Sequence, residues 1–330
     1  SKKPSRHVYE GFFCFFSGVV LNSMIKTYNN ELLTEIQLLS AIPNIERANS
    51  TFLENSLAIF LPFKRLDKTD VQKKFFTNNQ ILEVENNIFE KVEIRGRLLG
   101  QSHKDIMEIV LSKEKKYSRK TRSFNITTTA YEITKQLGKN IGNKKWLIQQ
   151  LKEIAECRIN IYFKDENDKL IDFNFNFIDS QLIINENEIT INFSRAYTYF
   201  MTKTELLSYK DYISDIIYLD VFCDNLSKKI GLARKINSDF IKAVVRYMLI
   251  HNGNNSNIKF ENLINKLNYT KLISEEQLKN CITDIKREEI QKYLNEKFGI
   301  SLKCDETTVS FNKLTNKSHY FINQKQETLF

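Results

Sequence analysis

The most restrictive feature of this sequence is an order of elements, three helices followed by a hairpin, that occurs twice along the chain. In each half, apolar residues first recur with the helical spacing i, i+3, i+4, i+7 and then alternate with polar residues. Three helices followed by a β-ribbon is the element order of a winged helix, a helix-turn-helix with a β-hairpin wing. The sequence therefore predicts an α+β fold with two tandem winged-helix domains and an N-terminal extension.

In the first half, two helix boundaries have clear chemical signals. Thr129-x-x-Glu132 is a capping box that starts a helix, and Gly138 ends it. Asn143 is a candidate cap for the next helix, whose core stripe contains Leu147 and Leu151. The helices are expected over residues 101–111, 129–138 and 143–155, and the strands over 159–163, 170–177, 181–184 and 188–193.

The second half repeats the order without repeating the residues. Ser238 is a candidate cap for the first helix, and Ser274-x-x-Gln277 is a capping box for the third. The helices are expected over 238–250, 261–267 and 274–285, and the strands over 258–260, 298–304 and 308–311. We expect three regions: an N-terminal extension over 1–85, a first winged helix over 86–205 that contacts DNA and mediates dimerisation, and a DNA-binding second winged helix over 206–330.

Composition favours a polyanionic partner and a reduced compartment. The chain has 49 Lys and Arg against 40 Asp and Glu, a net charge of +9. Its five cysteines form no CxxC pair, so neither a disulfide framework nor a zinc module is expected. The apolar stretch Gly11–Leu21 is shorter than the ~20 residues that a membrane-spanning helix needs. We therefore expect a cytoplasmic protein without cofactors or membrane contacts; export remains an alternative for this stretch.

Basic segments near the two expected helix-turn-helix units are candidate DNA contacts. Lysine and arginine side chains bind phosphates, and glutamine or asparagine can contact an adenine edge in the major groove. A solvated, charged surface is the alternative interpretation of each segment, and for both expected recognition helices it is equally tenable. The candidates are Lys113, Lys115, Lys116, Arg119, Lys120 and Arg122 in a loop; Lys144, Lys145, Gln149 and Lys152 on the first recognition helix; Lys228, Lys229, Arg234 and Lys235 before the second domain; and Lys279, Asn280, Lys286 and Arg287 on the second recognition helix.

The sequence contains no coherent catalytic constellation. The segment 138–145 has the wrong spacing for a phosphate-binding P-loop, and no Ser or Thr follows its lysine. Asp165, Glu166 and Asp168 lie in an expected tight turn, where such residues favour the turn itself. We therefore expect a binding protein and not an enzyme.

Three segments resemble a known family. Ile94–Ile106, with Gly96 and Asp105, is similar to the entry to the first domain of TrfA-like plasmid replication initiators. Tyr131–Gly138 and Leu147–Leu151 are similar to the short helix and the recognition helix of that family.

The resemblance extends over about residues 60–320, and in the second half it concerns the layout alone. It implies an initiator that binds repeated double-stranded origin sequences (iterons), melts adjacent DNA and recruits host DnaA and the replicative helicase. It also implies control of a monomer–homodimer equilibrium through the first domain. A winged-helix transcriptional regulator and a winged-helix protein-interaction module are the alternatives.

Overall fold

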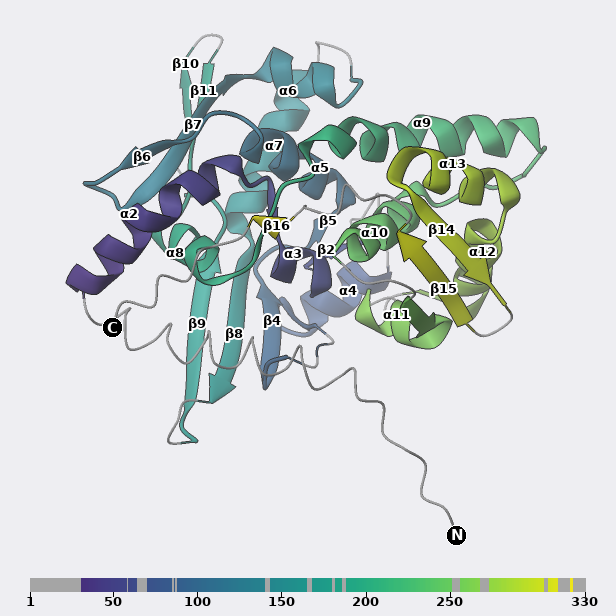
Figure 1. Cartoon of the computed structure of the whole chain (residues 1–330), viewed down its shortest axis with the longest axis horizontal. Coiled ribbons are helices and arrows are strands. Elements are labelled where there is room, and N and C mark those ends of the chain that lie inside the picture. The colour runs from purple at the N-terminus through teal and green to yellow at the C-terminus, as the bar shows by residue number, and fades with distance from the viewer. Residues whose placement is uncertain are drawn as a thin grey trace.

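The computed structural model has mixed α and β structure, in agreement with the predicted class (Figure 1). It describes residues 31–57, 59–63, 70–84, 86, 88–139, 143–164, 168–179, 182–185, 188–250, 256–267, 273–305, 308–313 and 321–322. The apolar stretch Gly11–Leu21 lies outside these residues. Within the described part, no helix is both long and apolar enough to cross a membrane.

Three helices that contact one another form the centre of the first half: α5 (Gln101–Leu111), α6 (Ala130–Gln136) and α7 (Lys144–Glu156). The predicted capping box starts α6, because the Thr129 hydroxyl accepts from the Glu132 N–H at 3.1 Å and the Glu132 carboxylate accepts from the Thr129 N–H at 3.4 Å. Gly138, just after α6, has the left-handed φ of 63° expected of a helix-ending glycine.

Two antiparallel sheets flank these helices. One has the order β3 (Ile81–Glu83), β4 (Lys91–Arg95), β8 (Arg158–Lys164) and β9 (Leu170–Asn176). The other has the order β10 (Ile183–Asn185), β11 (Glu188–Asn192), β7 (Ser123–Thr129) and β6 (Lys116–Ser118). The apolar face predicted for β8 is confirmed, since Ile159, Ile161 and Phe163 are all buried, although Asn160 on the other face is buried as well. Helix α8 (Arg195–Lys203), which was not predicted, packs Phe200 against Phe175 with ring centroids 4.7 Å apart.

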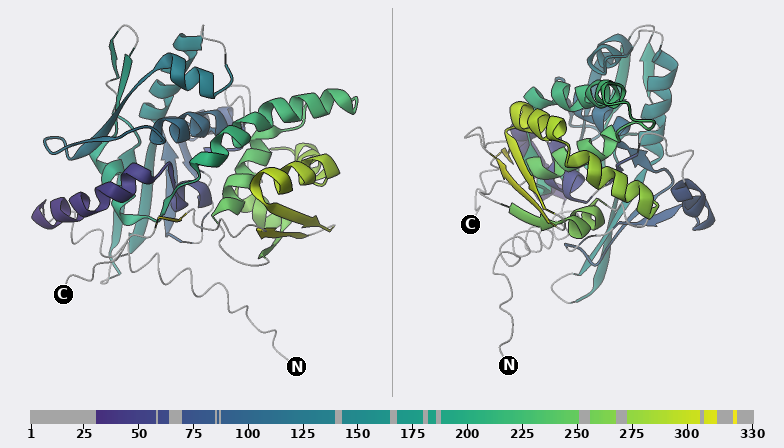
Figure 2. Two further views of the ribbon diagram at one scale, coloured as in Figure 1. Left: turned by 45° about the horizontal axis from the view of Figure 1, so that its top comes forward. Right: turned by 90° about the vertical axis from the view of Figure 1, so that its right-hand side faces the viewer.

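The second half gathers at the other end of the molecule (Figures 1 and 2). Its helices are α9 (Ile213–Lys229), α10 (Ser238–Leu249), α11 (Phe260–Lys266), α12 (Glu275–Ile285) and α13 (Glu288–Phe298), with a short 3₁₀ turn η3 (Lys210–Tyr212) before α9. Its strands β13 (Ser256–Lys259), β14 (Ile300–Cys304) and β15 (Thr308–Lys313) form an antiparallel sheet in the order β13-β15-β14. Every residue of α10 is buried, so this helix is the core of the second half.

Two helices of the second half were not predicted. Helix α9 precedes α10, and α13 lies between α12 and the hairpin. The hairpin was expected to begin at Phe298, but Phe298 ends α13, and Gly299 follows with a left-handed φ of 64°. A glycine in this conformation ends a helix, which is the physical reason why the strand begins later.

The segment before residue 86 is interwoven with the rest of the chain. Besides α2 (Glu31–Arg47), α3 (Phe52–Ser56) and α4 (Asp70–Thr77), it contributes three strands to three different sheets. Strand β1 (Ser50–Thr51) pairs with β12 (Leu206–Leu207), which also pairs with β16 (Phe321–Ile322). Strand β2 (Phe60–Leu61) runs parallel to β5 (Leu99–Gly100), and β3 pairs with β4. The predicted extension therefore supplies strands to three sheets of the fold, and β1 and β2 are fully buried.

Candidate nucleic-acid interface

Helix α7 divides its side chains between a buried and an exposed face. Leu147 and Leu151 are buried and fix the helix against its neighbours. Lys145, Gln149 and Lys152 are exposed, and Lys144 is half-buried. The candidate cap Asn143 stands at the N-cap position but makes no side-chain capping hydrogen bond. The structure thus places the predicted polar residues of this helix together on its accessible side.

A buried carboxylate of α7 itself holds one of these side chains. Glu153 accepts hydrogen bonds from Gln149 Nε2 at 3.1 Å and Arg97 Nη2 at 2.7 Å. His103 Nδ1 accepts from the Gly100 N–H, so its Nε2 donates to Glu153 at 3.0 Å. Burial raises the pKa of Glu153, but these partners outweigh it and hold the pKa at about 2. The ionised carboxylate therefore fixes the orientation of the Gln149 amide.

The corner between α6 and α7 presents aromatic rings next to cations. Lys139 Nζ lies 4.2 Å from the ring centroid of Trp146, the only tryptophan in the sequence. Lys135 Nζ lies 5.7 Å from the ring of Tyr131, which is exposed. Such cation–π pairs hold the amines close to the surface of the first half. Because Trp146 belongs to α7, its fluorescence would report directly on a ligand that binds there.

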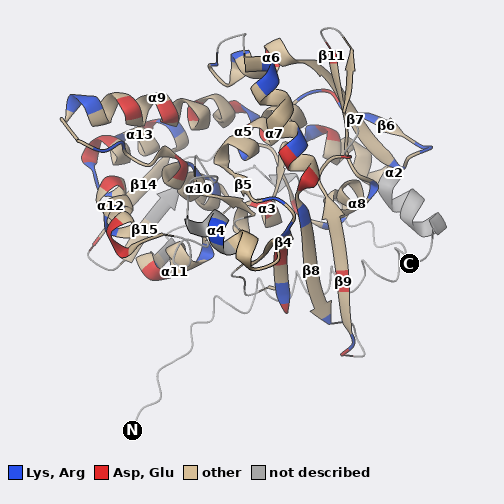
Figure 3. Ribbon diagram, turned by 180° about the vertical axis from the view of Figure 1, so that it is seen from behind, with Lys and Arg blue, Asp and Glu red and all other residues tan. Residues whose placement is uncertain are grey.

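The predicted basic loop is a β-hairpin. Strands β6 and β7 are paired up to Ser118 and Ser123, and the four residues 119–122 form its tip. Figure 3 shows basic residues at this tip. Lys116, Arg119 and Lys120 are exposed, whereas Arg122, which has a left-handed φ of 53°, and Lys113 are half-buried.

One predicted contact of this loop is displaced from the surface. Lys115 is buried, and its amine donates to the carbonyl oxygens of Glu46 at 3.1 Å, of Ala48 at 2.9 Å and of Leu111. Burial lowers the pKa of Lys115 to about 7, while the three carbonyl oxygens favour its ammonium form. Lys115 therefore joins the ends of α2 and α5 and lies outside the candidate interface.

The cluster before the second domain is partly neutralised. Asp224 lies 2.7 Å from Lys228 Nζ and 2.5 Å from Lys235 Nζ. Hydrogen bonds from these lysines hold the pKa of Asp224 at about 2. Arg234 donates to both carboxylate oxygens of Asp284 at 2.6 and 2.9 Å, so it joins the α9–α10 turn to α12. Lys229 is exposed.

Few of the DNA contacts predicted for the second recognition helix are exposed on that helix. Lys279 is exposed and Asn280 is half-buried, but Lys286 and Arg287 lie in the turn between α12 and α13. Lys286 Nζ is 5.2 Å from the Phe260 ring, and Arg287 Nε is 3.2 Å from Asp284. Helix α12 itself carries three acidic side chains and one lysine. The structure therefore does not gather these four residues on one helix face.

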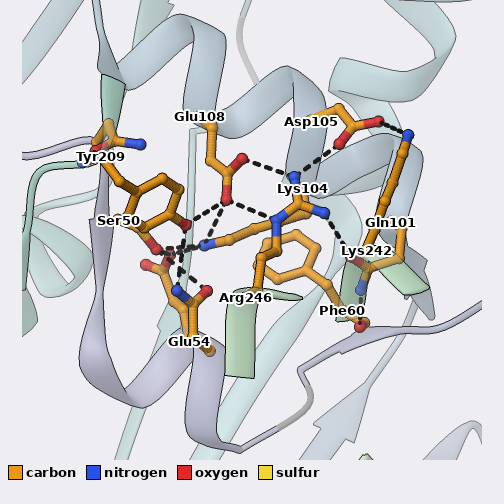
Figure 4. A network of polar contacts seen from close by, with 12 residues as sticks. Ser50, Glu54, Phe60, Gln101, Lys104, Asp105, Glu108, Tyr209, Lys242 and Arg246 are labelled. Carbon is orange, nitrogen blue, oxygen red and sulfur yellow. Dashed lines mark hydrogen bonds and ion pairs between the residues drawn. The ribbon is translucent and has the colours of Figure 1, made fainter. Parts of the chain in front are cut away.

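A buried polar network, which sequence reasoning missed, fixes the two halves to each other (Figure 4). Arg246 of α10 donates to Asp105 at 2.7 Å and to Glu108 at 2.6 Å, both on α5. Lys242 lies 2.7 Å from the same Asp105. Burial lowers the pKa of Lys242, but the carboxylates around it raise the pKa above its usual value, so the amine stays charged.

The network continues into the N-terminal segment. Lys104 of α5 donates to Glu54 at 2.6 Å and to Ser50 at 2.7 Å. The Tyr197 hydroxyl donates to the other Glu54 oxygen at 2.6 Å. The one sequence signal for this network is the spacing of Lys242 and Arg246, two cations four residues apart in an otherwise apolar helical segment. Their partners are distant in sequence, so the pairing itself had no local signal.

The chain matches no protein-family model, no curated protein and no solved structure. Among the residues that the structure describes, no group of three His, Cys, Asp or Glu side chains is arranged to hold a metal ion. Function is therefore inferred from the geometry of the chain itself.

Proposed function

We propose that this chain is a plasmid replication initiator that binds repeated double-stranded origin DNA through two winged-helix domains. In this proposal it opens the origin with binding energy and recruits the host DnaA and helicase, without catalysis of its own. The element order of both halves, the exposed cations of the first half and the resemblance of α5, α6 and α7 to TrfA-like initiators support it.

The second half supports the winged-helix assignment by its topology. A winged helix has the order helix, strand, helix, helix and then a two-stranded wing. The segment from α10 through β13, α11 and α12 to the β14–β15 hairpin follows this order, with α13 as an additional helix before the wing. Strand β13 pairs antiparallel with β15, so the strand between the helices joins the two-stranded wing in one sheet.

The main support for DNA binding is that α7 has one buried apolar face and one exposed polar face. A recognition helix must pack an apolar stripe on its own domain and present long polar side chains to the major groove. Helix α7 buries Leu147 and Leu151 and exposes Lys145, Gln149 and Lys152. Lysine can bind phosphate or guanine and glutamine can bind adenine, so this face suits base-specific contacts.

The test is a selection of duplexes from a random pool with the full chain, followed by titration of the selected site at two salt concentrations. Trp146 fluorescence is the readout, because the ring lies on α7. We expect one enriched motif, a fluorescence change on binding and affinity that falls steeply with salt. Arrays of that motif in plasmid origins would support an initiator, and single promoter sites would support a regulator. No enrichment and weak, salt-insensitive binding would contradict DNA binding and favour a protein-interaction module.

A further inference from the structure

The end of α4 and the turn that joins it to β3 are exposed. Phe76 is 53% exposed, although it follows Phe75, which is buried, with their ring centroids 6.0 Å apart. Residues 77–80 (Thr-Asn-Asn-Gln) are also exposed. One ring therefore anchors the end of α4 in the core while the next ring faces outward beside three side-chain amides.

This turn is held in an unusual backbone conformation. Asn79 and Gln80 are both left-handed, with φ of 52° and 58°, a region that residues with a Cβ rarely occupy. The Gln80 N–H donates to the Phe75 carbonyl at 2.9 Å, and Asn78 Nδ2 donates to the Ile81 carbonyl at 2.8 Å. These bonds fix the backbone of the turn and hold the Asn78 side chain against it.

The turn lies on the same side of the molecule as the candidate recognition helix. Figure 3 shows α4 on the viewed face, between α7 and α12. Lys73 of α4 is exposed and precedes Phe76 by three residues, which places the two on one side of the helix. An isolated exposed phenylalanine carries no information alone, but here it stands with a cation and several amides.

This combination is the chemistry of a minor-groove wedge. Proteins that bind the minor groove use Asn, Gln and Lys to contact its acceptors and insert an apolar side chain between base steps. Insertion unstacks the step and kinks the duplex by about 20–90°. An A·T pair presents only acceptors in this groove, so amide N–H donors suit A·T-rich DNA.

We propose that residues 76–80 form such a wedge: Phe76 inserts from the minor groove while the amides of Asn79 and Gln80 contact the base edges. This inference rests on the proposed function, because it requires the chain to bind duplex DNA through the same face. It supplies a physical route to origin opening, since an unstacked step is a nucleus for strand separation and no nucleotide hydrolysis is needed.

The experiment uses the full chain and the selected duplex, with donor and acceptor dyes at the ends and 2-aminopurine placed at successive positions. Energy transfer reports bending, and 2-aminopurine fluorescence reports unstacking. For the wild-type chain we expect a bend and a fluorescence rise at one step. Phe76→Ala should remove both while weakening binding by no more than about tenfold. Phe76→Leu, which keeps an apolar wedge, should retain most of the signal.

The control is Val221→Ala, which removes an exposed apolar side chain from α9 and should leave both signals unchanged. Equal thermal melting of the variants would show that Phe76 affects the DNA and not the fold. The wedge is overturned if Phe76→Ala bends and unstacks the duplex like the wild type, or if the wild type binds the site without either signal. Absence of wild-type binding to any duplex would overturn the proposed function itself, and the wedge with it.

Discussion

The two halves of the molecule share an order of elements but pair their strands differently. In the second half, β13 joins the β14–β15 hairpin in one sheet. In the first half, the corresponding strand β7 pairs with β6 and β11, while the β8–β9 ribbon joins β3 and β4. Element order can be predicted from a sequence, but it does not determine strand pairing when additional strands are present to pair with the same sheet edges.

Three helices of the second half expose more acidic than basic side chains. Figure 3 shows acidic residues on α11, α12 and α13, in contrast to the basic β6–β7 tip. Several of these acids occupy the first turns of their helices, where they stabilise the helix dipole. The exposed ones are Glu261, Glu275, Glu276, Glu288, Glu289 and Glu296. We therefore expect phosphate contacts to come mainly from the first half.

The largest expected effect is a loss of folding free energy when the buried ion pairs between the two halves are broken. Arg246→Met leaves the buried carboxylates of Asp105 and Glu108 without their shared partner, and removal of one member of a buried ion pair costs about 3–5 kcal/mol. Unfolding in urea, followed by Trp146 fluorescence for the first half and by circular dichroism for the whole chain, measures this loss. We expect the two transitions to coincide in the wild type and to separate in the variant.

Lys229→Met is the matched control for Arg246→Met, because Lys229 is exposed. It should change the free energy of unfolding by less than about 0.5 kcal/mol. A loss below about 1 kcal/mol for Arg246→Met would show that the network does not hold the halves together.

The next largest effect separates a lysine that stabilises the fold from a neighbouring lysine of the basic hairpin that is expected to bind DNA. Lys115→Met leaves three carbonyl oxygens without their donor, and each unsatisfied buried polar group costs about 1–3 kcal/mol. Lys116→Met, one residue later and exposed, should leave the melting temperature unchanged and weaken DNA binding. If the Lys115→Met variant melts like the wild type but loses DNA affinity, Lys115 contacts DNA and is not a structural residue.

The sequence predicted the elements whose signals are local. The Thr129 and Ser274 capping boxes stand where they were predicted, and α5 covers the predicted residues 101–111. The exposed face of α7 was predicted as well, because a 3.6-residue period separates core from surface within one helix.

The remainder depends on contacts between distant segments. Nothing near Lys115 in the sequence distinguishes it from Lys116, and only the ends of α2 and α5 make it a buried partner. Helix α13 was missed although Ile290, Leu294 and Phe298 recur along it with a spacing of four residues. Register and pairing across the sheets likewise had no local signal.

The charge contrast between the exposed face of α7 and helices α12 and α13 predicts unequal effects of equivalent substitutions. Lys145→Ala with Lys152→Ala should weaken binding to the selected duplex by about tenfold or more, since both lysines lie on the exposed face of α7. Lys279→Ala with Lys292→Ala removes the same charge from α12 and α13 and should cost less than about threefold. Fluorescence or anisotropy titration at one salt concentration measures both. Equal losses would show that both halves contribute equally to phosphate binding.

The smallest effect concerns the slope of affinity against salt. Lys116→Ala, Arg119→Ala and Lys120→Ala together should reduce the slope of log K against log salt by up to about 3, since each phosphate contact contributes about 0.9. The ranking of duplex sequences should stay the same, because phosphate contacts carry no base information. A changed ranking at constant slope would mean that the hairpin contacts bases, as a wing in the minor groove does.

The matched set for the hairpin is Lys228→Ala, Lys229→Ala and Lys235→Ala. Two of these lysines are already paired with Asp224, whose charge is released when they are removed. The slope should therefore change by less than about 1. A decrease as large as that of the hairpin set would place the backbone of the duplex along the α9–α10 turn, and the contact surface would then extend across both halves.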